Sequence, residues 1–150
     1  MVKGRNLRTD IEDLMEGTPL AVLATSGDDK PHTSLVAFAT VGKMDRLLFA
    51  TNRATKKFAN IKGNSQVALL VDNRTNQVSD FMDAIAVTVH GTAGELGGED
   101  RERMAGLYLA KHPHLKDFLA SPSTALVLVE VSKFDVAERF QWVMELVPDG

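Results

Sequence analysis

The sequence is dominated by short apolar runs, each about the length of one β-strand and bounded by residues that favour turns. Such runs are typical of antiparallel sheets. The predicted strands are Leu20–Thr25, Thr33–Thr40, Arg46–Thr51, Gln66–Asp72, Ala84–Leu96, Ser123–Val131 and, as a possible addition, Val136–Leu146. Because an open antiparallel sheet would leave exposed edges, six or seven such strands predict closure into a small barrel.

Three segments have the spacing of helices instead. The first runs from Leu7 to Gly17, and we interpret Thr9 and Glu12 as its capping box. The second covers Thr55–Lys62, and an amphipathic third covers Glu99–Lys111. The fold class is therefore mainly β with helices. The chain has no internal repeat or linker, so we expect residues 1–150 to form a single domain.

Composition excludes several classes of function. A net charge of −3 and a pI near 5.8 provide no basic surface for nucleic acid or anionic membranes. The absence of cysteine excludes disulfides, thiolate metal sites and a cysteine nucleophile. No apolar run approaches the length of a membrane span, and the first residues contain no apolar signal segment. We expect a cytoplasmic protein without nucleic-acid or membrane partners.

The transition from the third strand to the second helix carries an unfavourable charge pattern. Lys56 and Lys57 lie in the first turn of that helix, directly after Thr55. Cations at a helix N-terminus cost about 0.3–1 kcal/mol each, whereas an anion there is stabilised. One interpretation is a phosphate site made of backbone N–H groups, the Thr55 hydroxyl and both ammonium groups. The other is that the lysines only solubilise an exposed helix and Thr55 is an ordinary N-cap.

Several motifs stand in an order and spacing that resembles a known family. They are Leu20–Thr25, the turn at 27–31, Thr33–Phe38, Phe49–Lys57, Asn60, Asn64–Leu70 and Val89–Ala93. Over about two thirds of the chain they are similar to the pyridoxamine 5′-phosphate oxidase-like FMN-binding split barrels. The resemblance implies a six- to seven-stranded antiparallel split barrel that binds FMN. It also implies a homodimer in which both chains build each flavin pocket. We expect the apolar strand 125–131 to serve that interface.

The resemblance also implies the residues that bind the cofactor. Thr51, Thr55, Lys56 and Lys57 fall where the family grips the FMN phosphate. Four residues lie on the strand that lines the ribityl chain and the flavin ring: Thr33, Ser34, Leu35 and Val36. Ala50 precedes the phosphate clamp, and Trp142 is a candidate ring contact supplied by the partner subunit.

Other family features are missing. True pyridoxamine phosphate oxidases have an arginine and a lysine where this chain has Thr33 and Phe38, and a glutamine near the flavin where it has Ala86. Their Arg-x-His substrate motif is absent from residues 134–150. We therefore expect an FMN-dependent oxidoreductase that takes electrons from a reduced nicotinamide or another small-molecule donor, with the acceptor unidentified. No catalytic side chain is assigned, because the flavin carries the redox chemistry.

Two alternatives stay open, namely a non-enzymatic flavin- or haem-binding module and a deazaflavin-dependent reductase on the same barrel. The haem alternative comes from Lys111-His112-Pro113, which resembles a segment of haem-handling split barrels. His112 and His114 have no carboxylate or cysteine at ligand spacing, so we expect no metal site. His90, alone within an apolar strand, is interpreted as structural.

Overall fold

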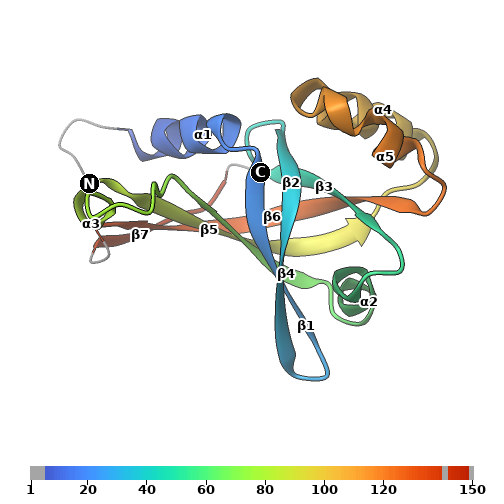
Figure 1. Cartoon of the computed structure of the whole chain (residues 1–150), viewed down its shortest axis with the longest axis horizontal. Coiled ribbons are helices and arrows are strands. Elements are labelled where there is room, and N and C mark those ends of the chain that lie inside the picture. The colour runs from blue at the N-terminus through green and yellow to red at the C-terminus, as the bar shows by residue number, and fades with distance from the viewer. Residues whose placement is uncertain (1–5, 140–141, 149–150) are drawn as a thin grey trace.

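The structure is a computed structural model that describes residues 6–139 and 142–148. In this part of the chain, seven strands form one antiparallel sheet in the order β3-β2-β1-β4-β5-β6-β7 (Figure 1). Their bounds are β1 Leu20–Gly27, β2 Lys30–Val41, β3 Arg46–Asn52, β4 Gln66–Asp72, β5 Ile85–Glu95, β6 Thr124–Glu138 and β7 Trp142–Leu146. The predicted meander of the first three strands is confirmed.

The sheet closes into a barrel because β6 pairs with β3. The edge of β6 that faces β3 has two successive neighbours. Its first half pairs with β3, from Asn52↔Thr124 to Arg46↔Glu130, and this pairing completes a six-stranded barrel. Its second half, from Phe134 onward, pairs with the short strand β7 instead. The predicted antiparallel barrel is therefore confirmed. The prediction ended β6 too early, because the strand continues to Glu138 before the chain turns back.

The helices are α1 Leu7–Gly17, α2 Lys56–Gly63, α3 Asp80–Asp83, α4 Gly98–Lys111, the 3-10 helix η1 Pro113–Leu115 and α5 Lys116–Ala120. In Figure 1, α1 and the α4–α5 pair lie on one side of the barrel, and α2 lies at the far end of β3. The sequence did not predict α3, η1 or α5, because about one turn is too short to show periodicity. No helix within the described residues is both long and apolar enough to cross a membrane.

The predicted capping box at the start of α1 is wrong. The N-cap is Asn6, whose Oδ1 accepts hydrogen bonds from the N–H groups of Arg8 at 2.9 Å and Thr9 at 3.4 Å. Thr9 therefore lies inside the first turn. The prediction for α2 is better: Thr55 is its N-cap, and the Thr55 side chain accepts from Phe58 N–H.

Two apolar cores lie on either side of β3. Leu47 and Phe49 point into the barrel interior, whereas Leu48 and Ala50 point outward into a second core beneath α4 and α5. Burial of both faces explains why β3 reads as a continuous apolar run instead of an alternating one. The second core contains Ala39, Val41, Leu48, Ala50, Met104, Tyr108, Leu119 and Leu126.

The expectation that strand 125–131 serves a subunit interface is wrong. Ala125, Leu126, Val127 and Val129 of β6 are fully buried inside this chain. Their side chains alternate between the barrel interior and the second core, because β6 closes the barrel beneath α5.

Gly91 is required at the β-bulge in the pairing of β5 with β6. The register between these strands shifts at His90/Gly91, and a Cβ on Gly91 would collide with the carbonyl oxygen of Glu130. We predict that Gly91→Ala lowers the free energy of unfolding by about 1–3 kcal/mol, measured by urea denaturation. Gly94→Ala is the matched control on the same strand, because a Cβ there meets nothing within 4 Å. Equal decreases in the free energy of unfolding for the two variants would contradict this role of Gly91 at the bulge.

Candidate functional site

The junction between β3 and α2 brings the two predicted hydroxyl groups together. Thr51 is the second-last residue of β3 and only 2% exposed, and its Oγ1 lies 3.0 Å from the Oγ1 of Thr55. Thr55 Oγ1 also donates to the carbonyl oxygen of Asn52 at 2.8 Å. The turn between strand and helix is thus fixed by side-chain hydrogen bonds, which hold both hydroxyls at the start of α2.

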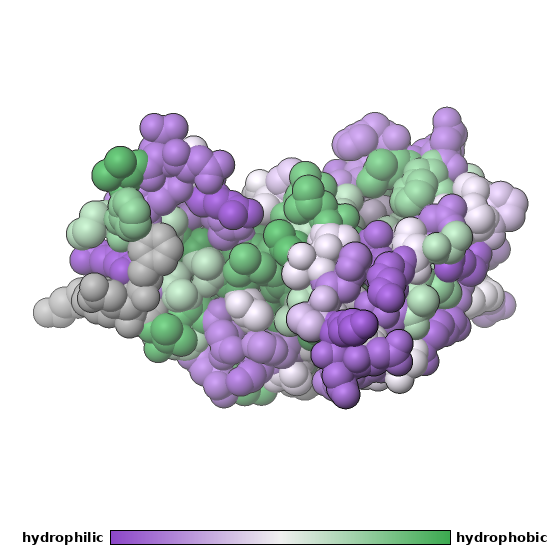
Figure 2. All heavy atoms as spheres, turned by 60° about the horizontal axis from the view of Figure 1, so that its bottom comes forward, coloured by the Kyte–Doolittle hydropathy of each residue, from purple (hydrophilic) through white to green (hydrophobic). Residues whose placement is uncertain are grey.

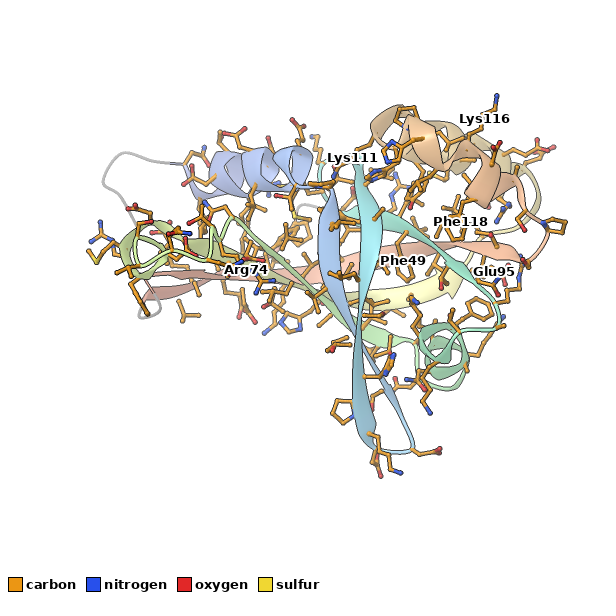
Figure 3. The ribbon with its side chains drawn as sticks, in the orientation of Figure 1. Phe49, Arg74, Glu95, Lys111, Lys116 and Phe118 are labelled. Carbon is orange, nitrogen blue, oxygen red and sulfur yellow. The ribbon has the colours of Figure 1, made fainter. Side chains whose placement is uncertain are left out.

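The cations around this junction fall into two groups. Arg53 donates from Nε to Glu95 Oε2 at 3.0 Å and from Nη1 to the carbonyl oxygen of Pro122 at 2.7 Å. Lys62, at the other end of α2, lies 3.8 Å from the same carboxylate, which is labelled in Figure 3. The hydrogen bond from Arg53 is the main reason why the pKa of Glu95 is below its usual value. Arg53 and Lys62 therefore have an anionic partner.

Lys56 and Lys57 form the second group. Within the described residues, neither ammonium group has an ion pair or a hydrogen bond. Their backbone N–H groups occupy the first two positions of α2, where a helix provides no internal acceptor. The positive end of the helix dipole adds to this charge, and the first turn contains no acidic residue. The arrangement is able to hold an anion such as a phosphate ester.

The predicted β2 residues lie beyond the point where β2 and β3 separate. Pairing between these strands runs from Val41↔Arg46 to Phe38↔Phe49 and stops, whereas β2 stays paired with β1 as far as Lys30. Thr33 and Leu35 point outward, and Leu35 is 66% exposed. Ser34 points inward, and its buried Oγ has no hydrogen-bond partner.

Three other predicted residues are placed differently. The side chain of Val36 packs in the barrel interior and that of Ala50 in the second core, so neither side chain lies between the strands. The side chain of Trp142 lies outside the described residues. Its backbone pairs with Glu138, which is up to about 46 Å of strand away from Thr124 at the junction.

The last turn of α4 fastens the helix to β2, through contacts that the sequence did not predict. The Tyr108 hydroxyl donates to the carbonyl oxygen of Ala37 at 3.0 Å. His112 Nε2 lies 2.7 Å from the carbonyl oxygen of Phe38, and it carries the proton because a carbonyl only accepts. Burial raises the pKa of Tyr108 to about 12 and is the main cause of a lowered pKa at His112.

Lys111, on the same turn, fastens α4 to α1. Its Nζ donates to the carbonyl oxygens of Met15 at 2.9 Å and Thr18 at 2.8 Å, and it lies 3.9 Å from the centre of the Phe38 ring. Figure 3 places Lys111 where α1, β2 and α4 meet. Burial lowers the pKa of this lysine to about 8, against an opposing effect of Glu16. The only signal in the sequence was polar residues spaced three and four apart on α4.

His90 also has a partner that the sequence did not reveal. Its Nε2 lies 2.8 Å from Oδ2 of Asp135 on the neighbouring strand β6. This pair supports the structural interpretation of His90. Among the described residues, no group of three or more His, Asp or Glu side chains is arranged to hold a metal ion.

A separate cavity of about 400 Å³ lies at the other end of the barrel, beside α3. It is lined by Leu70, Phe81, Ile85, Arg74 and Asp80, among others. Arg74 is labelled in Figure 3 at the end of the molecule away from α2. On the face shown in Figure 2, apolar side chains gather in a hollow between two polar regions.

A six-stranded closed barrel whose second and third strands part beyond four paired residues is a split barrel. The chain belongs to the pyridoxamine 5′-phosphate oxidase family, whose sequence profile matches residues 7–138. No curated protein matches the chain in sequence.

Solved structures of similar fold include three with different descriptions. A heme binding protein from Mycobacterium smegmatis has a TM-score of 0.81 at 12% identity, over 95% of this chain and 59% of that one. General Stress Protein 26 from Bacillus anthracis has a TM-score of 0.71 at 23% identity, over 95% and 100%. A FAD-binding protein from Mesorhizobium loti has a TM-score of 0.68 at 15% identity, over 85% and 90%. At these identities the likeness shows the fold alone.

The charge pattern of α2 predicts opposite effects for the same substitution at its two ends. In the ligand-free protein, Lys56→Glu should raise the free energy of unfolding by up to about 1 kcal/mol, because it places an anion at the positive end of the helix. Lys62→Glu should lower it by a similar amount, because it removes a cation from the last turn and opposes Glu95. Thermal unfolding in phosphate-free buffer at low salt measures both. Destabilisation by Lys56→Glu would show that the lysine already has a favourable partner.

Proposed function

We propose that this chain, acting as a single domain over residues 1–150, binds FMN and serves as an FMN-dependent oxidoreductase with an unidentified donor and acceptor. One observation carries the proposal: two ammonium groups without a partner among the described residues stand at the N-terminus of α2, beside two hydroxyls. Membership of the pyridoxamine 5′-phosphate oxidase family and the FAD-binding neighbour support a flavin.

The junction fits the phosphate end of FMN. A phosphate dianion would accept hydrogen bonds from the Lys56 and Lys57 backbone N–H groups and from both ammonium groups. Bonds of this charge-assisted kind are about twice as strong as neutral ones. Thr51 and Thr55 lie on the floor of the site. Their hydroxyl protons are engaged by each other and by the carbonyl oxygen of Asn52, so each would donate to the phosphate only after turning away from that partner. Lysine supplies charge without the bidentate fork of arginine, so the grip is electrostatic more than geometric.

The strands beyond the split fit the ribityl chain and the ring. Ser34 Oγ on β2 and Thr124 Oγ1 on β6 are buried oxygens without a hydrogen-bond partner. A buried polar atom left unpaired costs about 1–3 kcal/mol, which a polar ligand offsets. Thr33, Leu35 and the backbone of Ala50 complete the surface between the strands, while Val36 supports it from the barrel interior. The bound flavin would supply hydride or single-electron transfer, while the chain's residues bind and orient it.

Haem binding is less well supported. The neighbour from Mycobacterium smegmatis is described as a heme binding protein, but this chain spans only 59% of its length. The Nε2 of His112 is occupied by the carbonyl oxygen of Phe38, and that imidazole is 3% exposed. A deazaflavin would use the same phosphate site. A protein that takes up FMN supports the FMN proposal, whereas one that refuses FMN favours the deazaflavin alternative.

The phosphate site predicts a selective loss of affinity. In Lys56→Ala/Lys57→Ala, the dissociation constant of FMN should rise about a hundredfold, because two charge-assisted contacts are lost. Riboflavin has no phosphate, so its affinity should stay within about twofold. Flavin fluorescence titration measures both ligands. Lys62→Ala, at the opposite end of the same helix, is the matched control and should bind FMN like the unaltered chain. Unchanged FMN affinity in the double variant would refute the phosphate site.

We also propose that the flavin site is completed by a second copy of the chain. The backbone of Trp142 pairs near the opposite end of β6 from the junction, so we place its contact with the flavin across a subunit interface. Leu20 and Leu35 on the barrel exterior, and Phe81 and Met82 on α3, are between 49% and 66% exposed and form apolar surface for that contact.

A homodimer predicts twice the chain mass in solution. Sedimentation equilibrium should give a dimer, and Leu35→Lys should shift it toward monomer, because a buried unpaired charge destabilises an interface. A monomer for the unaltered protein at all concentrations would contradict the shared site.

A further inference from the structure

We propose that Tyr108 is a positioning residue for the flavin ring, because its hydroxyl ends the hydrogen bonding between β2 and β3 and keeps the two strands apart beyond that point. The inference rests on the proposed function, since it concerns the ring end of the same FMN site.

The first support is the position of the hydroxyl in the strand register. The last paired residues of β2 and β3 are Phe38 and Phe49, so the next pair along is Ala37 and Ala50. Tyr108 donates to the carbonyl oxygen of Ala37 at 3.0 Å. The N–H of Ala50 also faces the phenol oxygen and opposes the rise of the Tyr108 pKa. A side chain from α4 therefore engages one group from each strand, at the position where their separation begins.

The second support is the direction of the β2 backbone. Phe38 N–H donates to the carbonyl oxygen of Pro19, so it faces the β1 side. Neighbouring residues of a strand face opposite sides, which turns the N–H and C=O groups of Leu35 and Ala37 toward β3. Ala37 is engaged by Tyr108, whereas Leu35 lies where β3 no longer pairs with β2. The backbone of Leu35 is thus presented to a ligand between the strands.

The third support is the rigidity of the Tyr108 side chain. Tyr108 is 1% exposed and packs in the second core. Lys111 and His112, three and four residues further along α4, bind carbonyl groups of α1 and β2. The helix therefore cannot withdraw the hydroxyl without losing several buried hydrogen bonds, each of which is costly to leave unmade.

Removal of the hydroxyl should change the spacing of the strands. In Tyr108→Phe, the Ala37 carbonyl and the Ala50 N–H lose their shared partner at the half-buried edge of the second core. They regain a hydrogen bond only by closing directly on each other, because unpaired buried backbone groups are strongly disfavoured. This closure would draw β2 toward β3 and narrow the space for the ring, while the phosphate site at α2 stays intact.

The test compares Tyr108→Phe with Met104→Ala. Met104 is 6% exposed in the same core and on the same helix, but it has no hydroxyl with which to engage Ala37 or Ala50. We expect Tyr108→Phe to weaken FMN and riboflavin alike, by about tenfold or more, because the loss is at the ring they share. Met104→Ala should lower the melting temperature at least as much and leave both affinities within about twofold. Fluorescence titration well below the melting temperature measures the affinities.

The outcomes separate this inference from the proposed function. If the unaltered chain binds FMN and Tyr108→Phe binds both flavins equally well, the positioning role is refuted and the phosphate site stands. If Tyr108→Phe and Met104→Ala lose affinity to the same extent, Tyr108 acts only through stability, and the inference is again refuted. If the unaltered chain binds neither flavin, both proposals fail together.

Discussion

The arrangement of the molecule depends on where the hydrogen bonding between β2 and β3 stops. β3 is held between two cores and closed onto β6, while β2 is paired with β1 from Ala37 to Lys30. Once the pairing ends after Phe38 and Phe49, the strands diverge toward different partners: β2 continues into its hairpin with β1, and β3 leads into α2 (Figure 1). The same divergence places the β2 backbone and the start of α2 around one space, which a barrel paired throughout would fill with its own ladder.

The charges around α2 follow from this geometry. Glu95, at the end of β5, is within reach of Arg53 and Lys62, and it neutralises the cations on either side of the first turn. Lys56 and Lys57 are left without an anionic partner among the described residues, at the end of the helix where cations are least favourable. A protein that keeps such an arrangement gives up a little stability in the ligand-free state, and a bound phosphate dianion would recover it. The unfavourable position of the two lysines therefore points to an anionic ligand, whereas an uncharged first turn would give no such indication.

Local sequence patterns predicted most of the strands and the start of α2. Contacts between residues far apart in the sequence could not be predicted. Gln66–Asp72 is found with the predicted bounds, and Thr55 caps α2, because alternation and capping residues act over a few positions. Tyr108 and Ala37 are 71 residues apart, and His90 and Asp135 are 45 apart, so no local pattern announces either contact. The interface expected for strand 125–131 failed for a related reason, since an apolar strand reads the same whether its own helices or a second chain cover it. The assignment of cofactor residues stays a prediction.

The central claim is that this split barrel holds a flavin by its phosphate at the β3–α2 junction. The absorption spectrum of the purified, untreated protein, followed by denaturation and identification of any released chromophore, tests it most directly. The account predicts the two visible bands of an oxidised flavin and the release of FMN. A haem Soret band, or a colourless protein that takes up no added FMN, would contradict it.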